Sequence, residues 1–194
     1  MSRATGTTGV TVSAVALGGA IAAGGLAFAA AAGDVVGTRL PSVKGHSLAD
    51  DLVRFPEDLA GAPAVLLVAY RRGTQADVDR WTELLRREVP QVRFLEVPTI
   101  PNPLWRPLAG WIDGGMRRGV AREMWPSVVT LYREGGTLKR FLGDAGGLKA
   151  HVVVLDGSGT VAWFCADGYS DRAAAQLLAA LQRLSPSPLE VAVP

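Results

Sequence analysis

The chain has 194 residues, with 20 basic and 18 acidic side chains and a hydrophobic content of 48%. This length suits one ordinary domain with an appendage and excludes a large multidomain enzyme, while the hydrophobic content excludes wholesale disorder. Arg3 is the only charged side chain in residues 1–33, and the remaining charges are nearly balanced. No basic face is therefore indicated, and nucleic acid is not an expected partner.

An apolar run from Val10 to Ala32 follows a short N-terminal flank, residues 1–9. As a helix this run would be roughly 34 Å long, enough to cross a hydrocarbon core about 30 Å thick. Its length favours an uncleaved transmembrane anchor over residues 10–33, and the alternative is a secretory signal cleaved after Ala29 or Ala32. With Arg3 and the amino terminus in the cytoplasm, the rest of the chain would lie on the opposite, extracytoplasmic side of the membrane.

Small residues in this run would let a helix of another membrane subunit approach closely. The glycines expected to make that contact are Gly18, Gly19, Gly24 and Gly25.

Residues 34–45 are expected to be a linker, followed by a domain over residues 46–184 and a proline-rich tail over 185–194. In the domain, the continuous apolar run 64–70 predicts a strand that is buried on both faces. A helix is expected next, with Thr74 as its N-cap, and Pro90 ends it. Residues 92–97 predict a second strand.

The second half of the domain is expected to contain a helical region, two hairpins and a final helix. The helical region covers residues 104–124, with breaks at Pro107 and at Gly114–Gly115. The hairpins pair 127–132 with 138–142 and 151–155 with 160–165, and the last helix begins at Ser170.

This order of elements is that of an α/β thioredoxin-like fold, a central mixed sheet flanked by helices. Residues 152–163 resemble the Asp-Gly hairpin motif of peroxiredoxin-like proteins. Trp163 and the Trp/Arg-rich helix before the hairpin are similar to the Atp10 family of ATP-synthase assembly factors. The resemblance implies an accessory or assembly role at ATP synthase. Another energy-transducing membrane complex, a respiratory or photosynthetic assembly, is the alternative.

Thioredoxins and peroxiredoxins carry a reactive thiolate after the first core strand, where a helix begins. Here residues 70–77 contain no cysteine, and Cys165 is the only cysteine of the chain. A buried structural thiol is the favoured interpretation of Cys165. His46 and His151 lie in separate segments, and Lys149–Ala150 occupy the place of the fold's usual cis-proline. The sequence therefore predicts no catalytic residue, no cofactor and no metal site.

The segment 102–125 combines tryptophans and arginines, which are enriched at interface hot spots. The predicted partner-binding residues are Trp105, Arg106, Trp111, Arg117, Arg118 and Arg122. Three interpretations stay open: a surface for protein subunits of a membrane complex, a contact with lipid headgroups, or a helix that packs on its own sheet with its arginines in water.

The expected function is thus that of a non-catalytic, single-pass membrane protein that stabilises or assembles a membrane complex. Two alternatives remain at this point. One is an exported thioredoxin-like binding module whose leader is removed, and the other is a residual thiol-redox protein that uses Cys165.

Overall fold

The computed structural model describes residues 35–100, 109–143 and 148–185. A four-stranded sheet has the order β4-β3-β6-β7 and a smaller sheet has the order β2-β1-β5. β3 pairs with β4 in parallel and with β6 antiparallel, and β6 pairs with β7 antiparallel. The strands are β1 (Val43–Ser47), β2 (Leu52–Phe55), β3 (Ala64–Ala69), β4 (Arg93–Pro98), β5 (Val129–Thr130), β6 (His151–Leu155) and β7 (Val161–Cys165).

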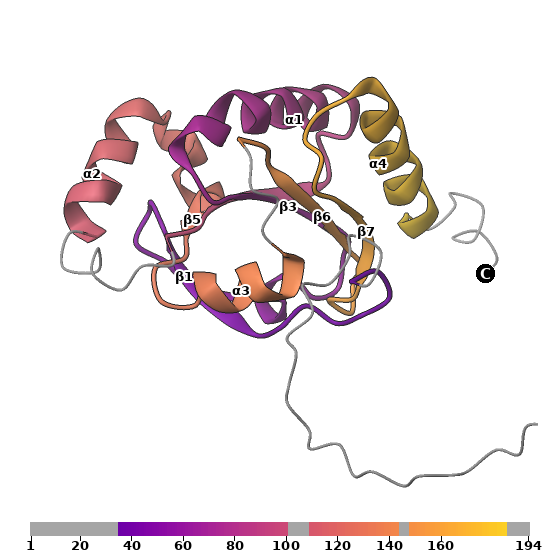
Figure 1. Cartoon of the computed structure of the whole chain (residues 1–194), viewed down its shortest axis with the longest axis horizontal. Coiled ribbons are helices and arrows are strands. Elements are labelled where there is room, and N and C mark those ends of the chain that lie inside the picture. Colours follow the sequence, from indigo (N-terminus) through magenta and orange to yellow (C-terminus); the bar gives the residue numbers. More distant parts are fainter. Residues whose placement is uncertain (1–34, 101–108, 144–147, 186–194) are drawn as a thin grey trace, which may run out of the picture.

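Helices lie on both sides of the larger sheet (Figure 1). α1 and α4 cover one face, while α3 and the small sheet lie over the other, and α2 stands beside α1. The α-helices are α1 (Gln75–Glu88), α2 (Ala109–Gly119), α3 (Gly135–Leu142) and α4 (Asp171–Leu184). The 3-10 helices within the described ranges are η1 (Glu57–Leu59), η2 (Arg72–Thr74) and η4 (Arg122–Ser127).

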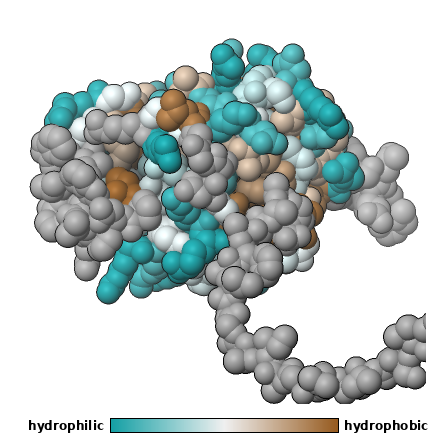
Figure 2. Space-filling model, viewed as in Figure 1, coloured by the Kyte–Doolittle hydropathy of each residue, from teal (hydrophilic) through white to brown (hydrophobic). Residues whose placement is uncertain are grey.

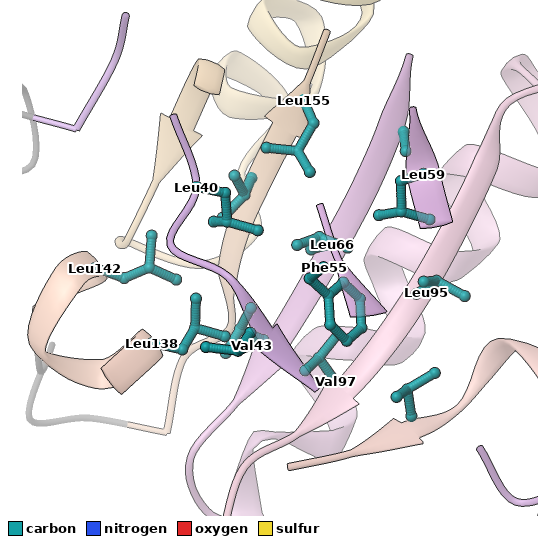
Figure 3. Packing of buried hydrophobic residues seen from close by; sticks show 14 of the residues in the cluster. Leu40, Val43, Phe55, Leu59, Leu66, Leu95, Val97, Leu138, Leu142 and Leu155 are labelled. Carbon is teal, nitrogen blue, oxygen red and sulfur yellow. The ribbon is translucent and has the colours of Figure 1, made fainter. Parts of the chain in front are cut away.

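β3 lies at the centre of the domain and supplies side chains to both hydrophobic cores. Its alternate residues Val65 and Leu67 face α1 and α4, where Trp81 is fully buried. Leu66 and Val68 face the opposite core, and Figure 3 shows Phe55 of β2 beside Leu66 there. Strand side chains alternate between faces, so a strand covered on both sides reads as the continuous apolar run seen in the sequence.

One predicted hairpin is wrong, because its second strand is a helix. Residues 135–142 form α3, which buries Leu138 and Leu142 against the β1 side of the core (Figure 3). These two leucines are four residues apart, so one face of a helix buries both. The glycines that predicted a turn stand at the start of the helix. A Cβ added to Gly135 would lie 2.5 Å from Cγ2 of Thr99, so glycine permits this close packing.

The expected boundaries also change at two places. Residues 34–45 were expected to be a linker, but β1 begins at Val43, and Val35 and Leu40 are buried. The helical region expected over 104–124 is α2 followed by η4, and α2 continues through Gly114–Gly115. Residues 101–108, with the expected break at Pro107, lie outside the described part.

The other predicted elements of the domain are confirmed within one or two residues. Ser170 is the N-cap of α4, and its Oγ accepts a hydrogen bond of 3.2 Å from the Ala173 amide.

Among the described residues, no helix is long and apolar enough to cross a membrane. The anchor expected over residues 10–33, with its four glycines, lies outside those residues, as does the tail from residue 186. Figure 2 shows hydrophobic residues on the visible face as separate patches among hydrophilic ones. Only Val36, Leu52 and Leu148 are large, exposed hydrophobic residues within the described ranges.

Candidate functional site

The first candidate site lies at the carboxyl end of β3, where the chain passes through η2 into α1. Thr74 occupies the predicted N-cap position of α1, but its side chain makes no capping hydrogen bond. η2 runs directly into α1, so Thr74 has helical backbone angles (φ −75°, ψ −13°) in place of the extended ones that direct a side chain back over a helix start. Thr74 is 1% exposed, and its Oγ1 finds no hydrogen-bond partner among the described residues.

Aromatic side chains and a lysine pack around the start of β6 beside this loop. His151 is 1% exposed, and its ring lies edge-on to Tyr70 and Phe164, with centroid distances of 5.1 and 5.6 Å. Lys139 of α3 places its Nζ 5.8 Å from the centroid of Tyr70, within the range of a cation–π contact. The imidazole is therefore held by packing within the protein and is not presented to solvent.

Asp77 joins three segments at the same end of the sheet. Its Oδ2 accepts a hydrogen bond of 2.8 Å from the Ala150 amide, and its Oδ1 accepts one of 2.8 Å from the Tyr169 amide. Asp77 is in the first turn of α1, whereas Ala150 precedes β6 and Tyr169 precedes α4. A carboxylate that accepts from two amides far away in sequence positions backbone segments, and both of its oxygens are engaged.

Cys165 lies at the end of β7, where burial outweighs the backbone hydrogen bonds that would lower the pKa of its thiol. It is half-buried, and its Sγ lies 3.7 Å from the carbonyl oxygen of Gly168, to which it can donate. Burial raises the pKa of the Cys165 thiol, opposite to the shift that produces a reactive thiolate at neutral pH. Within the described ranges, no three histidine, cysteine, aspartate or glutamate side chains are grouped so as to hold a metal ion.

The second candidate site is the Trp/Arg surface, formed by Arg117, Arg118, Arg122 and Trp125 of α2 and η4. Arg117 donates from Nε to the carbonyl oxygen of Leu48 at 2.7 Å, and its Nη2 lies 2.6 Å from Oδ1 of Asp50. Both contacts fix α2 to the turn between β1 and β2.

Trp125 is held between two arginines of this surface. The guanidinium carbons of Arg117 and Arg122 lie 5.4 and 5.7 Å from its ring centroid, and its Nε1 donates to the carbonyl oxygen of Val120 at 3.1 Å. The ring is thereby fixed in orientation. Arg118 and Arg122 are exposed, whereas Arg117 is largely occupied by the contacts above.

The structure brings two of the predicted partner-binding residues, Arg117 and Arg122, together at the ring of Trp125. Arg118 follows Arg117 in α2 and is exposed. Trp105 and Arg106 lie outside the described residues, and of Trp111 only the backbone, in α2, is described.

A half-buried carboxyl group lies beside α1. Glu96 of β4 accepts a hydrogen bond of 3.0 Å from the Thr82 hydroxyl, and burial raises its pKa. A shallow hollow over this part of α1 is lined by Asp79, Thr82, Glu83, Arg86 and Arg87. Its mixed charges select no particular ligand. The alternation of β4 alone gave no sign that Glu96 would face a helix.

No protein-family model matches the sequence, and no curated protein matches it. Solved structures do match. The thioredoxin domain of a thiol-disulfide oxidoreductase from Bacteroides vulgatus has 12% identity and a TM-score of 0.53, over 77% of this chain and 98% of that one. Copper-bound yeast Sco1 has 9% identity and a TM-score of 0.54, over 77% and 96% of the two chains.

BsSco, a member of the Sco family of cytochrome c oxidase assembly proteins, has 10% identity and a TM-score of 0.52, over 77% of this chain and 96% of that one. Identities this low show a shared fold and carry no conclusion about activity. The chain has a thioredoxin-like α/β fold, as predicted.

Proposed function

We propose that this chain is a non-catalytic thioredoxin-like protein that acts as an accessory subunit or assembly factor of an energy-transducing membrane complex. A single helix formed by residues 10–33 would anchor it, with its amino terminus in the cytoplasm and its domain across the membrane. ATP synthase is the complex implied by the resemblance to the Atp10 family, and a respiratory or photosynthetic assembly is the alternative.

The observation that supports a non-catalytic role is the environment of Thr74. It stands at the helix start where thioredoxin-like enzymes carry their nucleophile, yet it is 1% exposed. A nucleophile has to meet its substrate and needs a base or a lowered pKa. Thr74 has no hydrogen-bonded base among the described residues. The chain has one cysteine, so it cannot form an intrachain disulfide either.

Two structural neighbours are Sco proteins, and one of them is described as belonging to a family of cytochrome c oxidase assembly proteins. We infer for this chain an assembly role of the same general kind, exerted through contacts between surfaces and without thiol chemistry. The Trp/Arg surface is our candidate for the contact. Arg117 and Trp125 are fixed in place, and an interface on a preorganised surface loses less side-chain entropy on binding.

The test is purification of the C-terminally tagged chain in mild detergent, with identification of the co-eluting proteins and the intact mass of the bait. The same experiment is carried out with the double variant Arg118→Ala/Arg122→Ala and with the control Arg172→Ala/Arg183→Ala, which removes two exposed arginines from α4. We expect membrane-complex subunits with the wild type and the control, and a loss of at least about tenfold with the first variant, typical for hot-spot residues.

Three results would contradict the proposal. A soluble bait that lacks about 30 residues would favour the exported module. Equal recovery of partners by both double variants would exclude the Trp/Arg surface. Loss of biological activity in Cys165→Ser, with the partners retained, would favour the thiol-redox alternative.

A further inference from the structure

The domain is tightly packed from its first described residue. Val35 is 3% exposed. The Gly37 amide donates to the carbonyl oxygen of Val161 at 2.8 Å. The Val161 amide donates to the carbonyl oxygen of Thr38 at 2.9 Å. The Leu40 amide donates to the carbonyl oxygen of Gly159 at 3.0 Å. The segment 35–40 is therefore fixed along the edge of β7, and it provides no slack between the domain and whatever precedes it.

The connector to the proposed anchor is short. Only Gly33 and Asp34 separate the apolar run, which ends at Ala32, from the packed Val35. Three Cα–Cα steps span at most roughly 11 Å. The headgroup region of one leaflet is itself about 5–8 Å thick. If residues 10–33 cross the membrane, Val35 lies in or just above the headgroup layer, and the surrounding surface has to contact that layer.

The surface around Val35 is built from three segments, which we call the entry face: residues 35–40, 56–62 and 157–160. The Gly61 amide donates to the carbonyl oxygen of Gly157 at 2.8 Å. Arg39 donates from its guanidinium to the carbonyl oxygen of Ser158. We propose that the entry face rests on the lipid headgroups, an inference that depends on the anchor of the proposed function.

The chemistry of the entry face suits a headgroup layer. Val36 of the first segment is 45% exposed, and Ala60 and Ala62 of the second segment are exposed. Arg39, Glu57 and Asp58 are exposed as well, and the Asp58 carboxylate accepts a hydrogen bond of 2.8 Å from the Arg54 amide. Small apolar side chains mixed with charges of both signs match an interface that contains both phosphates and ammonium groups, and they require no deep insertion into hydrocarbon.

The Trp/Arg surface and Thr74 lie toward the other end of the sheet. The entry face adjoins the start of β3, where Ala64 pairs with Leu155. Thr74 follows the far end of that strand, which is six residues or roughly 20 Å long. Asp113 of α2 accepts a hydrogen bond of 2.6 Å from the Tyr132 hydroxyl. The residue before Tyr132, Leu131, forms a β-bridge with Thr99, which lies just beyond the end of β4. These contacts place Asp113 near the end of the sheet opposite to the entry face, so we infer that the Trp/Arg surface does not contact the headgroups.

The experiment places an environment-sensitive fluorophore on single cysteines in the full-length Cys165→Ser chain, reconstituted in phosphatidylcholine vesicles that contain a lipid with a nitroxide on its headgroup. Val36→Cys and Ala60→Cys report on the entry face. Ala76→Cys, on the first turn of α1, and Glu123→Cys, beside Trp125, are exposed controls. Flotation of the vesicles first shows whether the chain is membrane-bound. A variant with twelve Gly/Ser residues inserted between Asp34 and Val35 then tests the connector.

We expect about half of the fluorescence to be lost at positions 36 and 60 and little at 76 and 123, because the controls lie beyond the headgroup layer. The insertion should reduce quenching at 36 and 60 to the control level. A chain that floats without quenching at 36 and 60, or with deeper quenching at 123, overturns this inference alone. If quenching at 36 and 60 survives the insertion, the short connector is not what holds the entry face on the headgroups, and that part of the inference is wrong. A chain that does not float overturns the anchor, and the inference with it.

Discussion

Asp77 provides the sharpest test of how this end of the domain is held together. In Asp77→Ala, the amides of Ala150 and Tyr169 lose the carboxylate that accepts from both of them. Ala150 is fully buried, so water cannot easily replace the lost acceptor. A hydrogen bond to a charged group contributes about 1.5–3 kcal/mol, and an unsatisfied buried donor costs about 1–3 kcal/mol. We expect the free energy of unfolding to fall by about 2–4 kcal/mol.

Asp79→Ala is the matched control, because it removes the same side chain from the next turn of α1. Asp79 accepts only from the exposed Gln75 side chain at 2.8 Å in the described structure, so we expect a change below about 0.5 kcal/mol. Unfolding is followed by tryptophan fluorescence in urea, with the full chain in mild detergent. Trp81 reports locally, since its ring lies 5.0 Å from that of Tyr169. Equal destabilisation by the two variants would refute the role assigned to Asp77.

Two further predictions concern groups whose pKa is raised by burial. Because folded Glu96 holds its proton more tightly than the unfolded chain does, its ionisation costs stability as pH rises through the folded pKa. Glu96→Gln should be more stable than wild type at pH 7 in urea titrations, and a difference that does not shrink toward pH 4 would contradict this. Cys165 should react with a disulfide reagent at pH 8 more slowly in the folded chain than in urea, because burial raises the pKa of its thiol. A rate in the folded chain equal to or above that in urea would contradict this.

The central elements of the fold were predictable, because their sequence patterns are local. Residues 64–69 are apolar throughout, as expected for a strand covered on both faces. The turn at 156–159 separates two strands of the larger sheet, and Gly159 there has a φ of +83°, which glycine tolerates. Helix α4 has both an N-cap serine and a repeating apolar face.

The parts that were missed depend on contacts between distant segments. β1 and β2 are short and only half apolar, and β1 is specified by its pairing with β2 and β5. In α3, the pair Gly135–Gly136 has the composition of a hairpin turn, and the contact of Gly135 with Thr99 is what identifies it as a packing position. The local signs of this helix were the spacing of Leu138 and Leu142 and the glycine, Gly143, that follows its last turn.

The candidate sites show the same division. The missing cysteine at residues 70–77 could be read directly from the sequence, and so could the clustering of arginine and tryptophan before residue 126. The hydrogen bonds of Asp77 could not, because its partners are 73 and 92 residues away. The contact of Arg117 with the β1–β2 turn could not be predicted either. This contact distinguishes Arg117 from Arg118 and Arg122, which are exposed.

These observations favour a structural role for the polar groups at the first candidate site and make the Trp/Arg surface the candidate for recognition. At the end of β3, Thr74 is buried, His151 is enclosed by aromatic rings, and Asp77 is engaged by two amides, so the polar groups there stabilise the domain. On the Trp/Arg surface, exposed arginines stand beside a tryptophan whose orientation is fixed. If the entry face rests on the membrane, that surface is held above the headgroups at a nearly constant height. A membrane complex would then present its partner surface at that height, and the short connector would lower the entropy lost when the two surfaces bind.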